Sequence, residues 1–138
     1  MSESRTETYE YHFKYEPNWY WRIKEPTNED NKTMRDFLDE DRTEVDSEGN
    51  VYNMPYTYTE LARREIALLF AGTNIPKSGK KGKRVEEGGE PLIELGAPVG
   101  YIEYILMKLP HKMVMEIWYA IADYIPGWGP IVSSKNQD

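Results

Sequence analysis

The sequence contains no cysteine and has no long apolar run. Without cysteine the chain has no disulfides, no thiolate nucleophile and no thiolate metal ligands, a composition compatible with a reducing cytoplasm. None of its apolar stretches approaches the roughly 18 residues that a membrane-spanning helix needs. The first residues, Met1 to Arg5, lack the basic segment and apolar run of an export signal. We therefore expect a cytoplasmic protein that has no membrane span.

A nucleotide-binding loop is also missing. Gly79 and Lys80 resemble the end of a phosphate-binding loop, but Gly72 lies too far upstream for the required spacing. Lys81 stands where that motif needs a magnesium-binding serine or threonine. The sequence therefore predicts no nucleotide cofactor.

Metal and catalytic motifs are equally scarce. Asp46 begins a segment similar to a calcium loop, but Val51 occupies the position that needs glycine for the sharp turn. The two histidines, His12 and His111, have no helical ligand partner and no nearby nucleophile motif. We expect no metal, no cofactor and no enzymatic activity, although an enzyme with an unfamiliar site stays open as an alternative.

What the chain does contain is typical of one folded domain. It has 138 residues, of which 39% are hydrophobic and 30% charged, with 11 Tyr and 4 Trp. This composition is too aromatic for a disordered polymer, and the length suits a single core. We expect one domain over residues 1–132 and a disordered tail over residues 133–138. The net charge of −7 disfavours binding to nucleic acid.

Charge is unevenly spread along the chain. Ten acidic and three basic residues lie between Glu25 and Asn50, whereas a compact basic run extends from Lys77 to Arg84. Each block is either a docking surface or an ordinary solvated segment.

The N-terminal region predicts an aromatic β-hairpin. Aromatic and polar residues alternate from Thr8 to Tyr15, and the alternation resumes with Trp19, Trp21 and Ile23 after a turn that contains Pro17. A two-stranded ribbon is marginal alone, so either helices of this chain or a partner must cover its aromatic face. A second small hairpin is predicted over residues 43–52.

Four helices are predicted after the hairpin. Thr27 with Asp30, and Thr57 with Glu60, form capping boxes that begin the first two, which end near residues 40 and 72. Prolines begin the other two, at Pro98 and Pro110. Between the two pairs, residues 73–91 are rich in glycine and lysine and predict a long mobile loop. The expected fold class is α+β, with the aromatic hairpin packed on a small bundle of about four helices.

The order of these elements resembles a known family. A strand ends in the sequence Arg22–Ile23–Lys24–Glu25–Pro26–Thr27 and leads into a capped helix, and the last helix closes near Pro126 and Trp128. Over residues 8–132 this resembles the tail assembly chaperones of long-tailed bacteriophages. The resemblance implies a non-catalytic protein in the host cytoplasm that coats the helix-rich tape measure protein and keeps it soluble until the tail tube forms.

Aromatic side chains are the predicted partner contacts. Since tryptophan dominates many interfaces, the candidates are Trp19, Trp21, Trp118 and Trp128, with a core position as the alternative for Trp118. A different protein-binding role also stays open, in which an acidic phage-encoded inhibitor binds a basic host protein. The sequence leaves open whether the chain forms a homo-oligomer.

Overall fold

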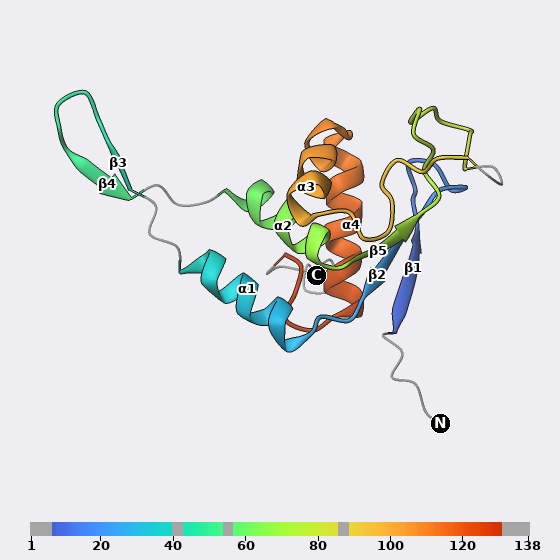
Figure 1. Cartoon of the computed structure of the whole chain (residues 1–138), viewed down its shortest axis with the longest axis horizontal. Coiled ribbons are helices and arrows are strands. Elements are labelled where there is room, and N and C mark those ends of the chain that lie inside the picture. The colour runs from blue at the N-terminus through green and yellow to red at the C-terminus, as the bar shows by residue number, and fades with distance from the viewer. Residues whose placement is uncertain (1–6, 40–42, 54–56, 86–88, 131–138) are drawn as a thin grey trace, which may run out of the picture.

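The computed structural model describes residues 7–39, 43–53, 57–85 and 89–130 (Figure 1). In these ranges it has an α+β fold, in which an antiparallel sheet packs on four helices. The fold class predicted from the sequence is therefore confirmed. The predicted tail, residues 133–138, lies outside the described residues.

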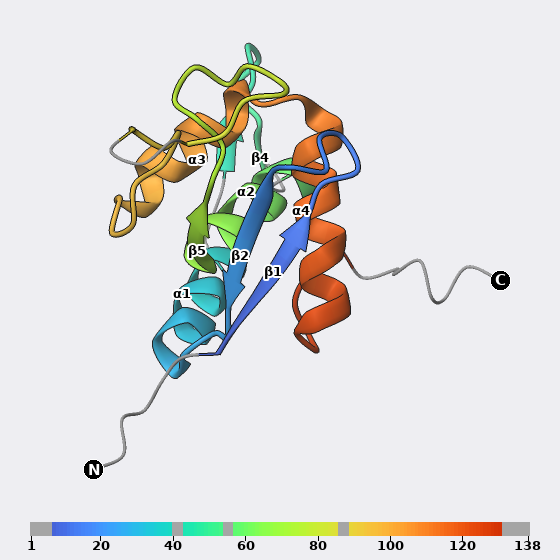
Figure 2. The ribbon, with the colours of Figure 1, turned by 90° about the vertical axis from the view of Figure 1, so that its right-hand side faces the viewer.

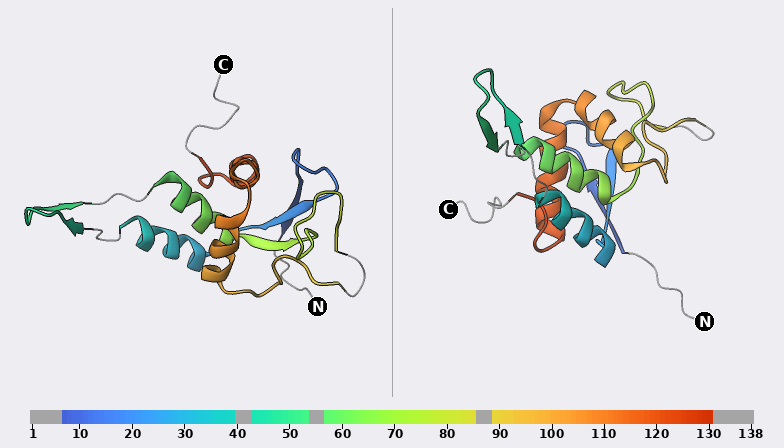
Figure 3. Two further views of the ribbon diagram at one scale, coloured as in Figure 1. Left: turned by 90° about the horizontal axis from the view of Figure 1, so that it is seen from above. Right: turned by 60° about the vertical axis from the view of Figure 1, so that its left-hand side comes forward.

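The predicted aromatic hairpin is present. Strands β1 (Thr8–His12) and β2 (Tyr20–Lys24) pair antiparallel, with Tyr11 opposite Trp21. Their alternating pattern directs Trp21 and Ile23 into the interior, where both side chains are fully buried. The helices lie on this side of the sheet (Figure 3), so the chain's own helices cover the apolar face of β2.

A third strand, β5 (Phe70–Thr73), extends the sheet in the order β1-β2-β5. The sequence prediction was wrong here, because it continued the preceding helix to about residue 72. The helix ends at Leu68, and the chain then pairs with β2, placing Gly72 opposite Arg22 and Phe70 opposite Ile23. Ala71 is the extra residue of this β-bulge, and Gly72 has a φ of +135° that only glycine adopts readily.

Both capping boxes are confirmed. Helix α1 (Asn28–Leu38) follows Thr27, whose hydroxyl accepts a hydrogen bond from the amide of Asp30. Helix α2 (Tyr58–Leu68) begins in the same way, with Thr57 accepting from the amide of Glu60. In each box the acidic side chain also accepts from the amide of the threonine, so two otherwise unpaired amides of the first turn are satisfied.

The prolines begin the last two helices as expected. Helix α3 (Val99–Lys108) follows Pro98, and helix α4 (His111–Tyr124) follows Pro110. Helix α3 packs against α2, while α4 runs beside both α2 and β1 (Figure 2). The core lies between these helices and the sheet, and its fully buried large side chains are Phe13, Trp21, Ile23, Ile66, Leu69, Ile75, Ile93, Leu106, Met113, Ile117 and Ile121.

The second predicted hairpin is also confirmed. Strands β3 (Thr43–Val45) and β4 (Val51–Asn53) pair antiparallel and form a separate two-stranded sheet. In Figures 1 and 3 this sheet extends away from the rest of the molecule. We call it the arm.

The predicted loop over residues 73–91 has more structure than its composition indicates. Ile75 is fully buried, and an isolated bridge pairs Pro76 with Pro91. The amide of Leu92 donates to the carbonyl of Ile75, and that of Val85 donates to the carbonyl of Asn74. Residues 86–88 lie outside the described residues, and the mobility of this loop stays a prediction.

Candidate protein-binding surface

The four tryptophans predicted as partner contacts are all buried. Trp19, Trp21, Trp118 and Trp128 expose 2%, 0%, 5% and 8% of their surface. In this structure they stabilise the fold, so a partner would first meet the residues around them. Their role in partner binding stays a prediction.

Two of these indoles, those of Trp21 and Trp19, make contacts between the sheet and neighbouring segments. Trp21 packs edge-to-face on Phe70, with ring centroids 5.0 Å apart. Its Nε1 is buried and has no hydrogen-bond partner in the described part of the chain. The indole Nε1 of Trp19 donates to the carbonyl of Lys83, which joins the hairpin to the lysine-rich segment around Lys83.

The other two tryptophans, Trp118 and Trp128, lie near the buried carboxylate of Glu65. Oε1 of Glu65 accepts from the indole Nε1 of Trp118 at 2.9 Å and from the amide of Gly129 at 2.7 Å. Burial raises the pKa of Glu65, and the two hydrogen bonds oppose that rise. Trp128 lies nearby and donates to Oδ1 of Asn31 at 3.2 Å. This cluster connects α2, α4, the C-terminal turn and α1.

A second carboxylate that sequence analysis missed connects the hairpin to α4. Glu116 accepts from the hydroxyl of Tyr11 at 2.5 Å and from the amides of Lys14 and Tyr15 at 2.7 and 3.1 Å. Burial and this hydrogen bond raise the pKa of Tyr11. The partners are separated by about a hundred positions in the chain, so no local sequence pattern could have shown the contact.

One side of α3 is an uncovered apolar feature. Tyr101, Tyr104 and Met107 are spaced three residues apart and therefore share one helix face, with 48%, 52% and 65% of their surface exposed. The opposite side of the helix buries Ile102 and Leu106 against the core. We call the exposed residues Tyr101, Tyr104 and Met107 the α3 face.

The tyrosines of the α3 face lie close together. Their ring centroids are 6.5 Å apart, and the ammonium of Lys108 lies 4.7 Å from the ring centroid of Tyr104. An ion pair of 2.9 Å between Arg64 of α2 and Glu103 of α3 joins the two helices. The α3 face is therefore a preformed surface that presents aromatic and thioether groups to solvent.

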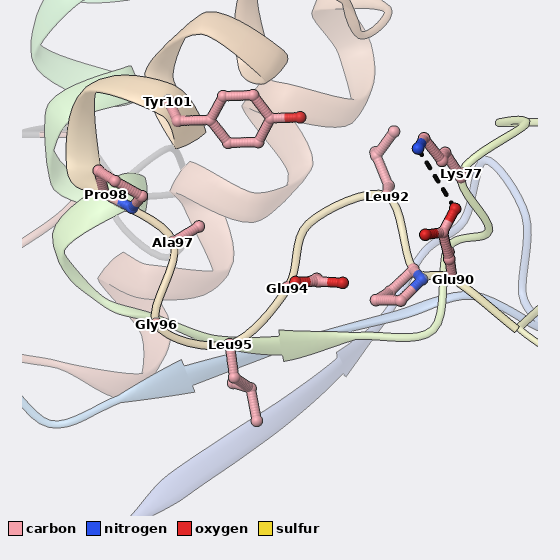
Figure 4. A pocket seen from close by; sticks show the side chains of 10 residues that line it. Lys77, Glu90, Leu92, Glu94, Leu95, Gly96, Ala97, Pro98 and Tyr101 are labelled. Carbon is pink, nitrogen blue, oxygen red and sulfur yellow. Dashed lines mark hydrogen bonds and ion pairs between the residues drawn. The ribbon is translucent and has the colours of Figure 1, made fainter. Parts of the chain in front are cut away.

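A shallow hollow continues this surface beyond the start of the helix. It has a volume of about 390 Å³ and is lined by Leu92, Ala97, Pro98 and Tyr101, with polar groups from Glu94 and from the pair Lys77–Glu90. Figure 4 shows the ring of Tyr101 lying over the hollow and the pair Lys77–Glu90 at the other side, joined at 3.2 Å. Leu95 points away from the ring of Tyr101 in this view.

A larger hollow of about 710 Å³ lies between α1 and the C-terminal turn. It is lined by Met34, Leu38, Glu65 and Trp128 together with polar side chains of α1. Because most of these polar side chains are exposed and carry charges of both signs, this hollow presents a less apolar surface than the α3 face.

Neither a metal centre nor a membrane span is found in the described ranges. No group of three or more His, Asp or Glu side chains there is placed to hold a metal ion. No helix in the same residues combines the length and the apolar character needed to cross a bilayer.

No protein-family model matches this chain, and the comparisons with curated proteins and with solved structures found no match either.

Proposed function

We propose that this protein binds a helix-rich protein without catalysing a reaction, as a tail assembly chaperone that keeps a tape measure protein soluble in the host cytoplasm. The α3 face is the observation that supports this proposal. Tyr101, Tyr104 and Met107 leave about half or more of their surface uncovered on a helix whose other side is already in the core.

The chemistry of the α3 face suits an amphipathic helix as the partner. Tyrosine and methionine are enriched at protein interfaces, and methionine adapts its shape to varied apolar partners. An amphipathic helix places apolar anchors every three or four residues, a spacing that matches the side chains along α3. The hollow beside Tyr101 could accept one such anchor at the end of the face.

The net charge supports the solubilising part of the role. A tape measure protein presents repeated apolar faces that associate when they are uncovered. A bound protein with a charge of −7 would cover such a face and make the complexes repel one another.

The test is co-expression with a candidate tape measure protein, a long helix-rich chain from the same genome. The variant replaces all three residues of the α3 face, Tyr101→Gln, Tyr104→Gln and Met107→Gln, because glutamine keeps helix propensity while removing the apolar surface. We expect the amount of soluble, co-purifying tape measure protein to fall roughly tenfold or more.

The matched control replaces exposed apolar residues elsewhere. Leu38 and Tyr119 expose 44% and 39% of their surface and lie outside the α3 face. The variant Leu38→Gln with Tyr119→Gln should keep the partner soluble, and both variants should unfold at the wild-type temperature. Undiminished solubilisation by the α3 variant would contradict the α3 face as the binding site. Failure of the wild-type protein to solubilise the candidate tape measure protein would contradict the chaperone role.

A further inference from the structure

The two strands of the arm are joined by a well-formed turn. Oδ1 of Asp46 accepts hydrogen bonds of 2.9 Å from the amides of Glu48 and Asn50, and these bonds hold the pKa of Asp46 below its usual range. Gly49 completes the turn with a φ of +85°. The turn that joins β3 to β4 is therefore specified by hydrogen bonds among its own residues.

The strands of the arm are exposed. Val45 and Val51 lie opposite each other and expose 64% and 67% of their surface. An isolated two-stranded ribbon is marginally stable in water, so an apolar cross-strand pair of this kind gains from being covered. Two exposed glutamates belong to the arm. Glu48 lies in the turn, and Glu44, which precedes Val45, lies on the other face of the ribbon.

The basic loop, which we define as residues 77–85, carries the opposite charge and is firmly attached. Glu16, only 8% exposed, accepts from the amide of Gly82 at 2.7 Å and from the amide of Asn18 at 3.1 Å. The ammonium of Lys81 lies 4.4 Å from the ring centroid of Tyr15. These contacts hold the loop against the turn of the aromatic hairpin.

The basic loop also borders a hollow. This hollow measures about 550 Å³ and combines the apolar residues Pro76 and Val85 with one carboxylate, Glu90, and a larger set of basic side chains, namely Lys77, Lys80, Lys83 and Arg84. Lys77 pairs with Glu90. Within the described ranges, Lys80, Lys83 and Arg84 form no ion pair.

The two features are complementary but lie apart. The arm has an apolar pair and exposed carboxylates, and the hollow has apolar residues and an excess of cations. In Figure 1, whose horizontal direction is the longest axis of the molecule, the arm is at one end and the basic loop at the other. Within one copy of the chain they are therefore separated by the body of the molecule.

We propose that the arm of one copy binds the hollow of the basic loop of a second copy. Val45 and Val51 would cover Pro76 and Val85, while Glu48 in the turn would lie against the lysines and Arg84. Glu44, on the other face of the ribbon, would add to the negative charge of the arm. The two surfaces differ, so the contact is head-to-tail and each copy retains one free arm and one free loop for further copies. Such a contact produces a ring or an open chain of copies. It involves none of the three residues of the α3 face and does not depend on the partner proposed above.

Sedimentation velocity of the full chain over a range of concentrations tests this self-association. We expect the average mass to rise with concentration and to fall with added salt, because the Debye length shrinks from about 10 Å at 0.1 M to about 3 Å at 1 M. A wild-type protein that stays monomeric at all concentrations would overturn the proposal.

Charge reversal identifies the surfaces. The arm variant carries Glu44→Lys with Glu48→Lys, and the loop variant carries Lys80→Glu with Lys83→Glu. We expect each variant alone to associate at least about tenfold more weakly than the wild type. The control Asp36→Lys with Asp123→Lys changes two exposed carboxylates elsewhere and makes the same change in net charge as the arm variant; it should associate like the wild type.

Mixing the two variants provides the decisive result. In the mixture, the lysine-bearing arm of the arm variant can bind the glutamate-bearing loop of the loop variant. The native arm of the loop variant can likewise bind the native loop of the arm variant. The average mass of the mixture should therefore exceed that of either variant alone. Self-association that survives both reversals, or a mixture that stays monomeric, would overturn the proposal. Loss of single-stranded DNA binding in the loop variant, with a monomeric wild type, would assign the basic loop to nucleic acid instead and would equally overturn it.

Discussion

Replacement of Glu65 provides a sensitive probe of how the C-terminal turn is attached to the helices. The side chain is 7% exposed, and its Oε1 is the acceptor for both Trp118 and Gly129. Glu65→Ala removes that acceptor and leaves two donors without a partner. Glu65→Gln keeps a carbonyl oxygen at the same position but cannot ionise.

The two variants should differ strongly in stability. An unsatisfied buried donor costs about 1–3 kcal/mol, and the half-buried amide of Gly129 should cost less than the indole because water can reach it. We therefore expect Glu65→Ala to lower the free energy of unfolding by about 2–4 kcal/mol. Glu65→Gln should stay within about 1 kcal/mol of the wild type in acid, where the native carboxyl is protonated.

The pH dependence follows from the direction of the pKa shift. Burial raises the pKa of Glu65 in the folded state above its value in the unfolded chain. The contribution of Glu65 is thus fully present below the unfolded pKa and is lost as the pH rises through the folded pKa. The stability of Glu65→Gln relative to the wild type should therefore increase with pH over this window and then level off.

Urea unfolding followed by tryptophan fluorescence, from roughly pH 4 to pH 8, measures these differences. The comparison with Glu65→Gln isolates Glu65 from other carboxylates, such as Glu10, whose pKa is lowered by its hydrogen bond with His12. Two results would refute the reasoning: a glutamine variant as unstable as the alanine variant, or a difference between glutamine and wild type that does not change with pH.

Two other substitutions test the packing of the core. Gly129→Ala should lower the free energy of unfolding by about 2–5 kcal/mol in thermal or urea unfolding. A Cβ there would lie 2.6 Å from both Cβ and the amide nitrogen of Ala122, and the φ of +89° is unfavourable for alanine. Gly127→Ala, with similar φ but open space around it, should cost only about 1–2 kcal/mol, and equal losses would contradict the clash. Trp21→Ala should lower the free energy of unfolding by roughly 3–5 kcal/mol. Trp21→Phe should lower it clearly less, because Phe keeps an aromatic ring and Nε1 of Trp21 has no hydrogen-bond partner among the described residues; equal losses would contradict this reasoning.

Local signals in the sequence predicted much of the fold. The capping boxes at Thr27 and Thr57 and the prolines before α3 and α4 mark helix starts because they act within a single turn of backbone. The alternation around Trp21 indicates a half-buried strand for the same reason. The turn at Asp46 is specified by its own residues and was therefore predictable as a hairpin.

The features that sequence analysis missed depend on distant partners. Phe70 continues the apolar face of α2, so periodicity extended the helix, but pairing with β2 ends it at Leu68. The basic loop is attached by Glu16 and Trp19, which lie more than sixty positions away in the chain. Glycine and lysine content describes the local preference of such a loop and contains no information about these contacts.

The candidate binding surface could have been inferred from an excess of apolar residues on α3. A helix at the surface of a domain usually has one apolar stripe and one polar side. The apolar periodicity that predicts α3 assigns Val99, Ile102 and Leu106 to the core, and these residues lie on one side of the helix. Tyr101, Tyr104 and Met107 then remain on the other side, where an ordinary surface helix would carry charged residues. The described part of this chain leaves them exposed, and this surplus is what supports the proposed binding surface. The same reasoning from surplus apolar residues supports the proposed role of Val45 and Val51 of the arm.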